Sequence, residues 1–156
     1  MRAYAVRYNG DPDVWGLAGL LHDFDWEIHP NAQEHPAVGA PMLRAAGVTE
    51  DVIYAIQAHA DYLQLDRATM MDKCLPAVDE LCGFVIAVAL VRPTKSLSDV
   101  DVASVKKKMK DKAFARAVQR EDIVSGAELL GVSLDEHIAF VLGAVRAISP
   151  QLGLNL

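Results

Sequence analysis

Histidines and acids gather at the predicted ends of helices in the first half of the chain. Four of the five histidines lie within the first 60 residues. His22 is followed directly by Asp23 at the end of one predicted helix, His35 precedes a second, and His59 ends a third. Imidazole and carboxylate together are ligands for Zn, Fe, Mn, Ni or Co, whereas a structural sulfur site needs thiolates. This pattern predicts a divalent metal site centred on His22 and Asp23.

Asp79 is a further candidate ligand, because it lies inside the most apolar predicted helix of the chain. A carboxylate in such a helix needs a partner, since an unpaired buried charge is very costly. A metal ion would supply that partner. Because each ligand would come from a different helix end, the metal would tie the helices together.

Each candidate also has a simpler interpretation when it is taken alone. His22 at a helix C-terminus interacts favourably with the helix dipole, and His35 could be an exposed loop residue. Asp79 could pair with Lys73 or Arg92. Taken together, the candidates favour the metal site over these separate explanations.

The elements that must position these residues are helical almost throughout, with no apolar and polar alternation typical of strands. Asn9-Gly10 ends a first helix over residues 1–8, and Asp11 with Pro12 opens a second that reaches His22. A polar loop is expected over residues 23–34. Further helices are expected at 36–46, 49–60, 69–91, 98–109, 111–117, 121–130 and 134–148. The predicted fold class is therefore all-α, a compact bundle of about seven or eight helices.

Several local signals fix the expected helix ends and contacts. Ser98 is the expected N-cap of the 98–109 helix, and Ser133 with Glu136 forms a capping box at the last helix. Gly16 and Gly19 cost helix stability, so we expect another element to pack closely against them.

Composition narrows the class of protein. A chain of 156 residues fits one domain over residues 1–156. Its net charge of −6 argues against general nucleic-acid binding. No signal peptide or membrane-spanning segment is visible. Cys74 and Cys82 would lie about 12 Å apart on one helix, too far for a disulfide. We expect a cytoplasmic protein with free thiols and no membrane partner.

The motifs resemble those of the HD-domain metal-dependent phosphohydrolases, in particular the small stand-alone bacterial members, and the resemblance covers essentially the whole chain. The residues that carry it are Leu20-Leu21-His22-Asp23-Phe24-Asp25-Trp26-Glu27, Glu34-His35-Pro36, Ala58-His59-Ala60, Asp79-Glu80-Leu81-Cys82-Gly83-Phe84, Val91-Arg92-Pro93 and the stretch from Ser104 to Ala115. The resemblance implies an all-α fold with a metal held by His22, Asp23 and Asp79. His35 and His59 would complete a second metal position.

One ligand of the family pattern has no counterpart here. The pattern opens with a further histidine on a preceding helix, and residues 1–8 contain none. The chain is therefore expected to be N-terminally short relative to the family. Weaker metal binding, a homodimer through the apolar surface that this shortness exposes, and loss of the metal with Cys74 as the nucleophile all remain open. A small buried apolar residue is the simpler interpretation of Cys74.

The resemblance implies hydrolysis of a phosphate ester at a metal-activated water. Asp23 would ligate the metal and orient or deprotonate that water, with His22 beside it. Lys73 and Arg92 are candidate contacts to the substrate phosphate, whereas Arg44 is interpreted as a surface charge. The basic run over residues 106–112 would either attract phosphate or form a solvated helix face.

The predicted function is a hydrolase of phosphate mono-, di- or triesters, with a small phosphorylated substrate. Its expected cofactor is a divalent ion (Mn, Zn, Fe, Co or Ni), and one ion, two ions or none are all open. Two alternatives are a metal-independent hydrolase that uses Cys, Asp and His, and a non-catalytic helical module that dimerises or binds a ligand.

Overall fold

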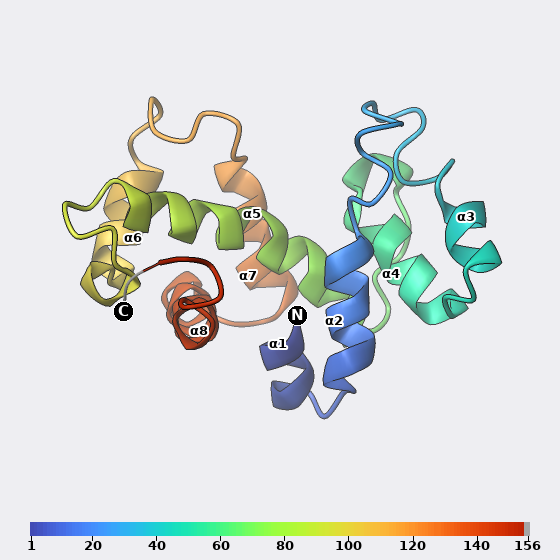
Figure 1. Cartoon of the computed structure of the whole chain (residues 1–156), viewed down its shortest axis with the longest axis horizontal. Helices are drawn as coiled ribbons and strands as arrows, with labels where there is room; N and C mark the ends of the chain where they lie inside the picture. The colour runs from blue at the N-terminus through green and yellow to red at the C-terminus, as the bar shows by residue number, and fades with distance from the viewer. Residues whose placement is uncertain (155–156) are drawn as a thin grey trace. The chain divides into compact units, whose positions relative to one another are not determined.

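Helices joined by turns make up the computed structural model, which describes residues 1–154, and no β-strand occurs among these residues (Figure 1). The all-α prediction is confirmed. Two short 3-10 helices, η1 (Asp61–Leu63) and η2 (Leu97–Asp99), stand among the α-helices. The eight α-helices of the described part are α1 Arg2–Arg7, α2 Pro12–Leu21, α3 Ala40–Ala45, α4 Glu50–His59, α5 Met70–Leu90, α6 Val102–Met109, α7 Arg120–Leu129 and α8 Leu134–Ala147.

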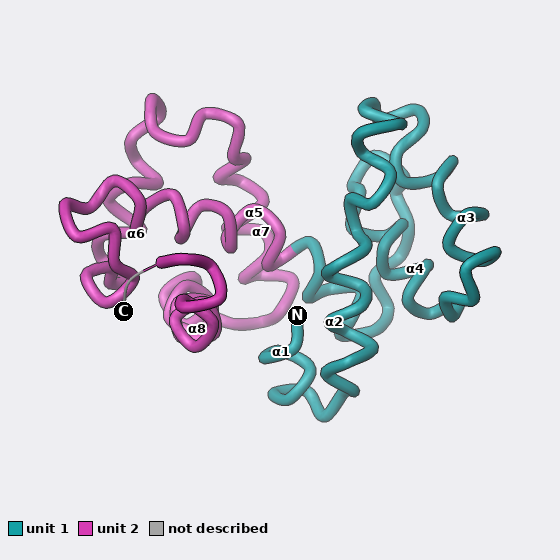
Figure 2. The backbone as a smooth tube through the Cα atoms, viewed as in Figure 1, with its two compact units in different colours: residues 1–76 teal, residues 77–156 magenta. Residues whose placement is uncertain are grey.

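The chain divides into two compact units, Met1–Pro76 and Ala77–Leu156 (Figure 2). Helix α5 runs from the first unit into the second and contains Pro76 in its interior. The expectation of one domain over residues 1–156 stays a prediction. None of the described helices combines the length and the apolar character needed to cross a bilayer.

In the first unit, α2 begins where the sequence predicts. The Asp11 carboxylate accepts hydrogen bonds from the amides of Asp13 and Val14, and Pro12 occupies the first helical turn. Helix α2 packs against α1 and α4. A Cβ added at Gly16 would come within 2.7 Å of Arg2 Nε in α1, so the expected close approach at this glycine is confirmed.

Helix α3 is shorter than predicted, because it begins at Ala40 rather than at Pro36. Residues 32–39 instead form consecutive turns, held by bonds such as the Val38 amide to the Glu34 carbonyl. Pro36 donates no backbone hydrogen bond and Gly39 disfavours a regular helix. These turns bring His35 toward the end of α2.

In the second unit, α7 crosses α5 at close range. A Cβ added at Gly126 would lie 2.7 Å from the Ala77 Cα, so only a glycine fits this contact. On the same stretch of α5, His137 Nε2 of α8 lies 2.8 Å from the Ala77 carbonyl oxygen. Both α7 and α8 therefore contact α5 at Ala77.

Two predicted elements of the second unit are wrong. Ser98 lies inside η2, and α6 is capped instead by Asp101, whose carboxylate and backbone amide exchange hydrogen bonds with Ser104. Residues 111–117 form turns rather than a helix, because the Arg120 guanidinium donates to carbonyl oxygens in and beside this segment. Ser133 caps α8 as predicted, accepting a bond from the Glu136 amide.

Candidate metal centre

Three histidines from separate parts of the first unit surround the carboxylate of Asp23. His22 directly follows α2, His35 lies in the turns before α3, and His59 is the last residue of α4. Their Nε2 atoms lie 3.3, 3.3 and 3.8 Å, respectively, from oxygens of Asp23. The structure thus brings four of the five predicted ligands together in the first unit, whereas the fifth, Asp79, belongs to the second unit.

The other ring nitrogen of each histidine faces an acceptor. Nδ1 of His22 lies 2.9 Å from the Gly19 carbonyl oxygen, and Nδ1 of His59 bonds the Ile56 carbonyl oxygen. Nδ1 of His35 lies 2.7 Å from Oδ1 of Asp25. Carbonyl and carboxylate oxygens only accept, so Nδ1 carries a proton in each ring. A neutral ring then turns the lone pair of Nε2 toward Asp23.

This convergence of lone pairs and a carboxylate requires positive charge at its centre. Ligand atoms of Asp23, His35 and His59 all lie within 4.8 Å of one another, a spacing that fits one metal ion. Histidines whose Nδ1–H is held by a backbone carbonyl or a carboxylate are the usual ligands of such ions. Protonating the rings is the alternative, but it would bury imidazolium charge at His35 and His59. The residues therefore fit a divalent ion.

The cluster opens to solvent on the side of Asp23. The Asp23 side chain is 52% exposed, whereas His35 is buried and His59 nearly so. If the rings are protonated in the absence of an ion, a hydrogen bond from His22 holds the pKa of Asp23 below its ordinary value against the opposing effect of burial, and the charges of the three imidazolium rings add to this lowering. Asp23 is thus an ionised group that a solute can reach.

Asp25 forms a second layer behind His35. Its side chain is fully buried, and its Oδ2 has no hydrogen-bond partner among the described residues. Gly39 makes room for it, since a Cβ there would overlap Oδ2 and lie 2.7 Å from both the Asp25 Cγ and the Phe24 Cζ. A buried charge next to a metal ligand holds the ring in one orientation.

Two aromatic side chains border the cluster. Trp26 meets the His35 ring edge-on, with the centroids 5.0 Å apart and an interplanar angle of 89°. The Tyr62 hydroxyl donates a 2.7 Å hydrogen bond to the His35 carbonyl oxygen. Burial, followed by the charges of Asp23 and Asp25, raises the pKa of Tyr62, so it remains a donor. Both rings are about half exposed.

The other predicted site residues lie outside this cluster. Asp79 is half-buried in α5 within the second unit, and its role as a ligand stays a prediction. Lys73 is half-buried on α5 in the first unit. Arg92 follows α5 and lines a cavity of the second unit. Arg44 forms two hydrogen bonds with Glu50 at the surface, as expected of a surface charge.

Cys74 is completely buried, and burial raises the pKa of its thiol to about 12. It is therefore protonated at neutral pH, which disfavours a nucleophilic role. This environment supports the interpretation of Cys74 as a small apolar residue of the core.

Sequence reasoning assigned no role to Asp25, Gly39 or Tyr62. Asp25 had a usable signal, because a second acid two residues after Asp23 occurs in the same polar loop. Gly39 and Tyr62 had none, since their importance depends on contacts with residues distant in the sequence.

Comparisons with known proteins identify a family and a relative to which this chain is similar. A family model described as HD domain matches residues 1–127. Ribonuclease Y from Cutibacterium acnes (strain DSM 16379 / KPA171202) is 32% identical over 79 residues, which make up 49% of this chain. The chain spans only 14% of the length of that relative. No solved structure matches the chain.

Proposed function

Because this chain belongs to the HD domain family, we propose that it is a phosphoric ester hydrolase that depends on a divalent metal ion. The superfamily consists of metal-dependent phosphohydrolases, which gives the general class of reaction. The finer proposal is that His22, Asp23, His35 and His59, all of the first unit, hold the ion. The convergence of three imidazole Nε2 atoms on the Asp23 carboxylate carries this proposal.

When bound, the ion would lower the pKa of a water molecule and polarise a phosphoryl oxygen. The protein residues supply the remaining functions. Asp23, ionised and half exposed, orients the attacking water. His22 either donates a hydrogen bond to Asp23 or binds the ion beside it. Asp25 and Tyr62 fix the ring and the backbone of His35, so the ligand geometry is set before substrate arrives.

The proposed substrate is a small phosphate ester. The open side at Asp23 is bordered by Trp26, so a substrate with an apolar or aromatic group would gain contact area there. Lys73, which lies in the same unit as the cluster, remains a proposed contact to the phosphate, whereas Arg92 belongs to the second unit and lines another cavity. The relative is named as a ribonuclease, so a phosphodiester of RNA belongs among the substrates to be tested, although the net charge of −6 disfavours general nucleic-acid binding.

The experiment is a hydrolysis assay on chelator-treated protein with p-nitrophenyl phosphate, bis-p-nitrophenyl phosphate and a short RNA. We expect no turnover in chelator and recovery on addition of Mn, Zn, Co, Ni or Fe. The variant His59→Ala should stay inactive after the addition, whereas His29→Ala, whose ring pairs with Glu34 outside the cluster, should recover. Full activity of metal-free protein would instead support the metal-independent alternative.

A further inference from the structure

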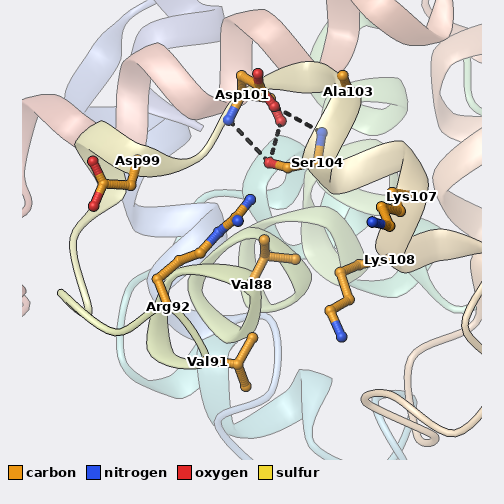
Figure 3. Close-up of a pocket in the computed structure, with 9 residues that line it drawn as sticks. All are labelled: Val88, Val91, Arg92, Asp99, Asp101, Ala103, Ser104, Lys107 and Lys108. Atoms are coloured by element: carbon orange, nitrogen blue, oxygen red, sulfur yellow. Dashed lines mark hydrogen bonds between the residues drawn. The ribbon is translucent and has the colours of Figure 1, made fainter.

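The second unit contains a cavity of about 610 Å³ between the end of α5 and helix α6 (Figure 3). Its size is within the range of about 300 to 1,000 Å³ that is usual for sites of small molecules. None of the residues that line it is a proposed metal ligand. These residues are Val88, Val91, Arg92, Asp99, Asp101, Ala103, Ser104, Lys107 and Lys108.

Two cations of this cavity form no hydrogen bond or ion pair with the described part of the chain. Arg92 is half-buried, and among the described residues its guanidinium makes no hydrogen bond or ion pair; the same is true of the ammonium group of Lys107. A guanidinium that is partly withdrawn from water and left unpaired is unfavourable. Its planar donors match the oxygens of a phosphate group. Arg92 and Lys107 are thus available to an anion from solution.

The third cation is held in place by its neighbours. Lys108 lies 3.4 Å from Oδ2 of Asp111, and its ammonium group stands 4.7 Å from the centroid of the Phe114 ring. It adds positive potential to the cavity without being free to follow a ligand.

The two acidic side chains that line the cavity accept hydrogen bonds from residues close to them in the sequence. Oδ1 of Asp101 accepts the Ser104 amide at 2.7 Å, as the cap of α6. Oδ2 of Asp99 accepts the Thr94 hydroxyl. Neither carboxylate forms an ion pair with Arg92 or Lys107 among the described residues. The hydrogen bonds from Ser104, with a smaller effect of the Arg92 charge, lower the pKa of Asp101, so Arg92 keeps its donors free for an anion although Asp101 partly offsets its charge.

Apolar side chains complete the cavity. Figure 3 shows the Arg92 guanidinium reaching into the hollow, with Val88 and Val91 on its side and the two lysines across from it. Val91 is more than half exposed. An occupant that carries both a phosphate and an organic group would therefore satisfy the cations and cover the exposed Val91.

We propose that this cavity is a second binding site, for a small phosphorylated organic compound the size of a mononucleotide. The phosphate is bound by Arg92 and Lys107, and the organic group packs against the exposed Val91. Neither the family match nor the proposed hydrolytic centre assigns a role to this site.

The test is isothermal titration calorimetry on the full chain in the presence of a chelator. The probes are AMP, adenosine and inorganic phosphate. We expect AMP to bind, inorganic phosphate to bind more weakly, and adenosine not to bind. Arg92→Gln and Lys107→Gln should each weaken AMP binding at least tenfold. Lys107 is exposed, so its variant keeps the test informative if Arg92→Gln fails to fold.

Lys110→Gln is the matched control, because Lys110 belongs to the same basic run but does not line the cavity. Its affinity for AMP should equal that of the wild type. Equal weakening by Lys110→Gln and Lys107→Gln would overturn the proposal in favour of general charge attraction, and equal binding of adenosine and AMP would also overturn it. His35→Ala should bind AMP normally, so this result is independent of whether the chain hydrolyses phosphate esters. Loss of AMP binding in chelator or in His35→Ala would assign the ligand to the metal cluster and contradict a second site.

Discussion

Nδ1 of His35 donates a 2.7 Å hydrogen bond to Oδ1 of Asp25, and the two side chains are only 2% and 0% exposed. The bond fixes the proton on Nδ1 and leaves Nε2 facing Asp23, 3.3 Å away. The buried carboxylate of Asp25 therefore fixes the orientation of the His35 ring. This arrangement is typical of the outer layer of a metal site.

Asp25→Asn tests the importance of that carboxylate. The amide preserves the size of the side chain but removes the charge that holds the Nδ1–H of His35. We expect metal affinity to fall by about 10- to 100-fold, measured by competition with a chromogenic chelator. Glu34→Gln is the matched control, since Glu34 pairs with His29 outside the cluster and its loss should leave affinity unchanged. Equal affinities of Asp25→Asn and wild type would show that Asp25 does not position His35.

Gly39 and Gly83 should respond in opposite ways to a methyl group. A Cβ at Gly39 would press on Asp25 and Phe24, so Gly39→Ala should destabilise the protein by about 1 to 3 kcal/mol. A Cβ at Gly83 meets nothing within 4 Å inside α5. Gly83→Ala should therefore stabilise it by about 0.5 to 1 kcal/mol. Urea unfolding monitored by circular dichroism measures both, and a neutral Gly39→Ala would contradict the packing described around Asp25.

The buried thiol of Cys74 should make the protein sensitive to alkaline pH. Its pKa rises from 9.0 to about 12 on folding, so the folded state holds its proton where the unfolded state has lost it. Stability from this group is complete below pH 9 and declines as pH rises toward 12. Urea midpoints at pH 7.5 and 10 should therefore differ less in Cys74→Ala than in wild type. Equal losses in the two proteins would refute this origin of the alkaline sensitivity.

Trp26 should affect the choice of substrate more than the chemistry. Its ring is half exposed and meets His35 edge-on, so it offers an apolar wall beside the cluster. Trp26→Ala should raise KM for p-nitrophenyl phosphate several-fold, with a much smaller effect on the hydrolysis of methyl phosphate. Steady-state kinetics with both substrates measure the difference. Equal changes for the two esters would place Trp26 in a purely structural role.

The helices and the candidate metal ligands could be predicted where local signals determine them. Asp11 and Pro12 begin α2 through bonds to the next few residues, and His22 and His59 stand at helix ends that the pattern of apolar residues locates. The meeting of His22, Asp23, His35 and His59 could be inferred because residue type restricts which chemistry such helix ends can support.

Contacts between distant residues explain what the sequence did not predict. Tyr62 reaches the carbonyl oxygen of His35 across 27 positions, and no local pattern encodes such a bond. Residues 111–117 have helical composition, yet the Arg120 guanidinium donates hydrogen bonds to carbonyl oxygens of this segment. Asp101 caps α6 in place of Ser98, because the Ser104 side chain also accepts a hydrogen bond from the Asp101 amide.

Stoichiometric metal binding tests the central claim most directly. Chelator-treated wild type, His35→Ala and His29→Ala would be titrated with Zn or Mn, and bound metal measured by elemental analysis after desalting. The convergence of His22, His35 and His59 on Asp23 predicts at least one ion per chain in wild type and in His29→Ala, and loss of that ion in His35→Ala. Wild-type protein that binds no divalent ion, or His35→Ala that binds as much as wild type, would contradict the account.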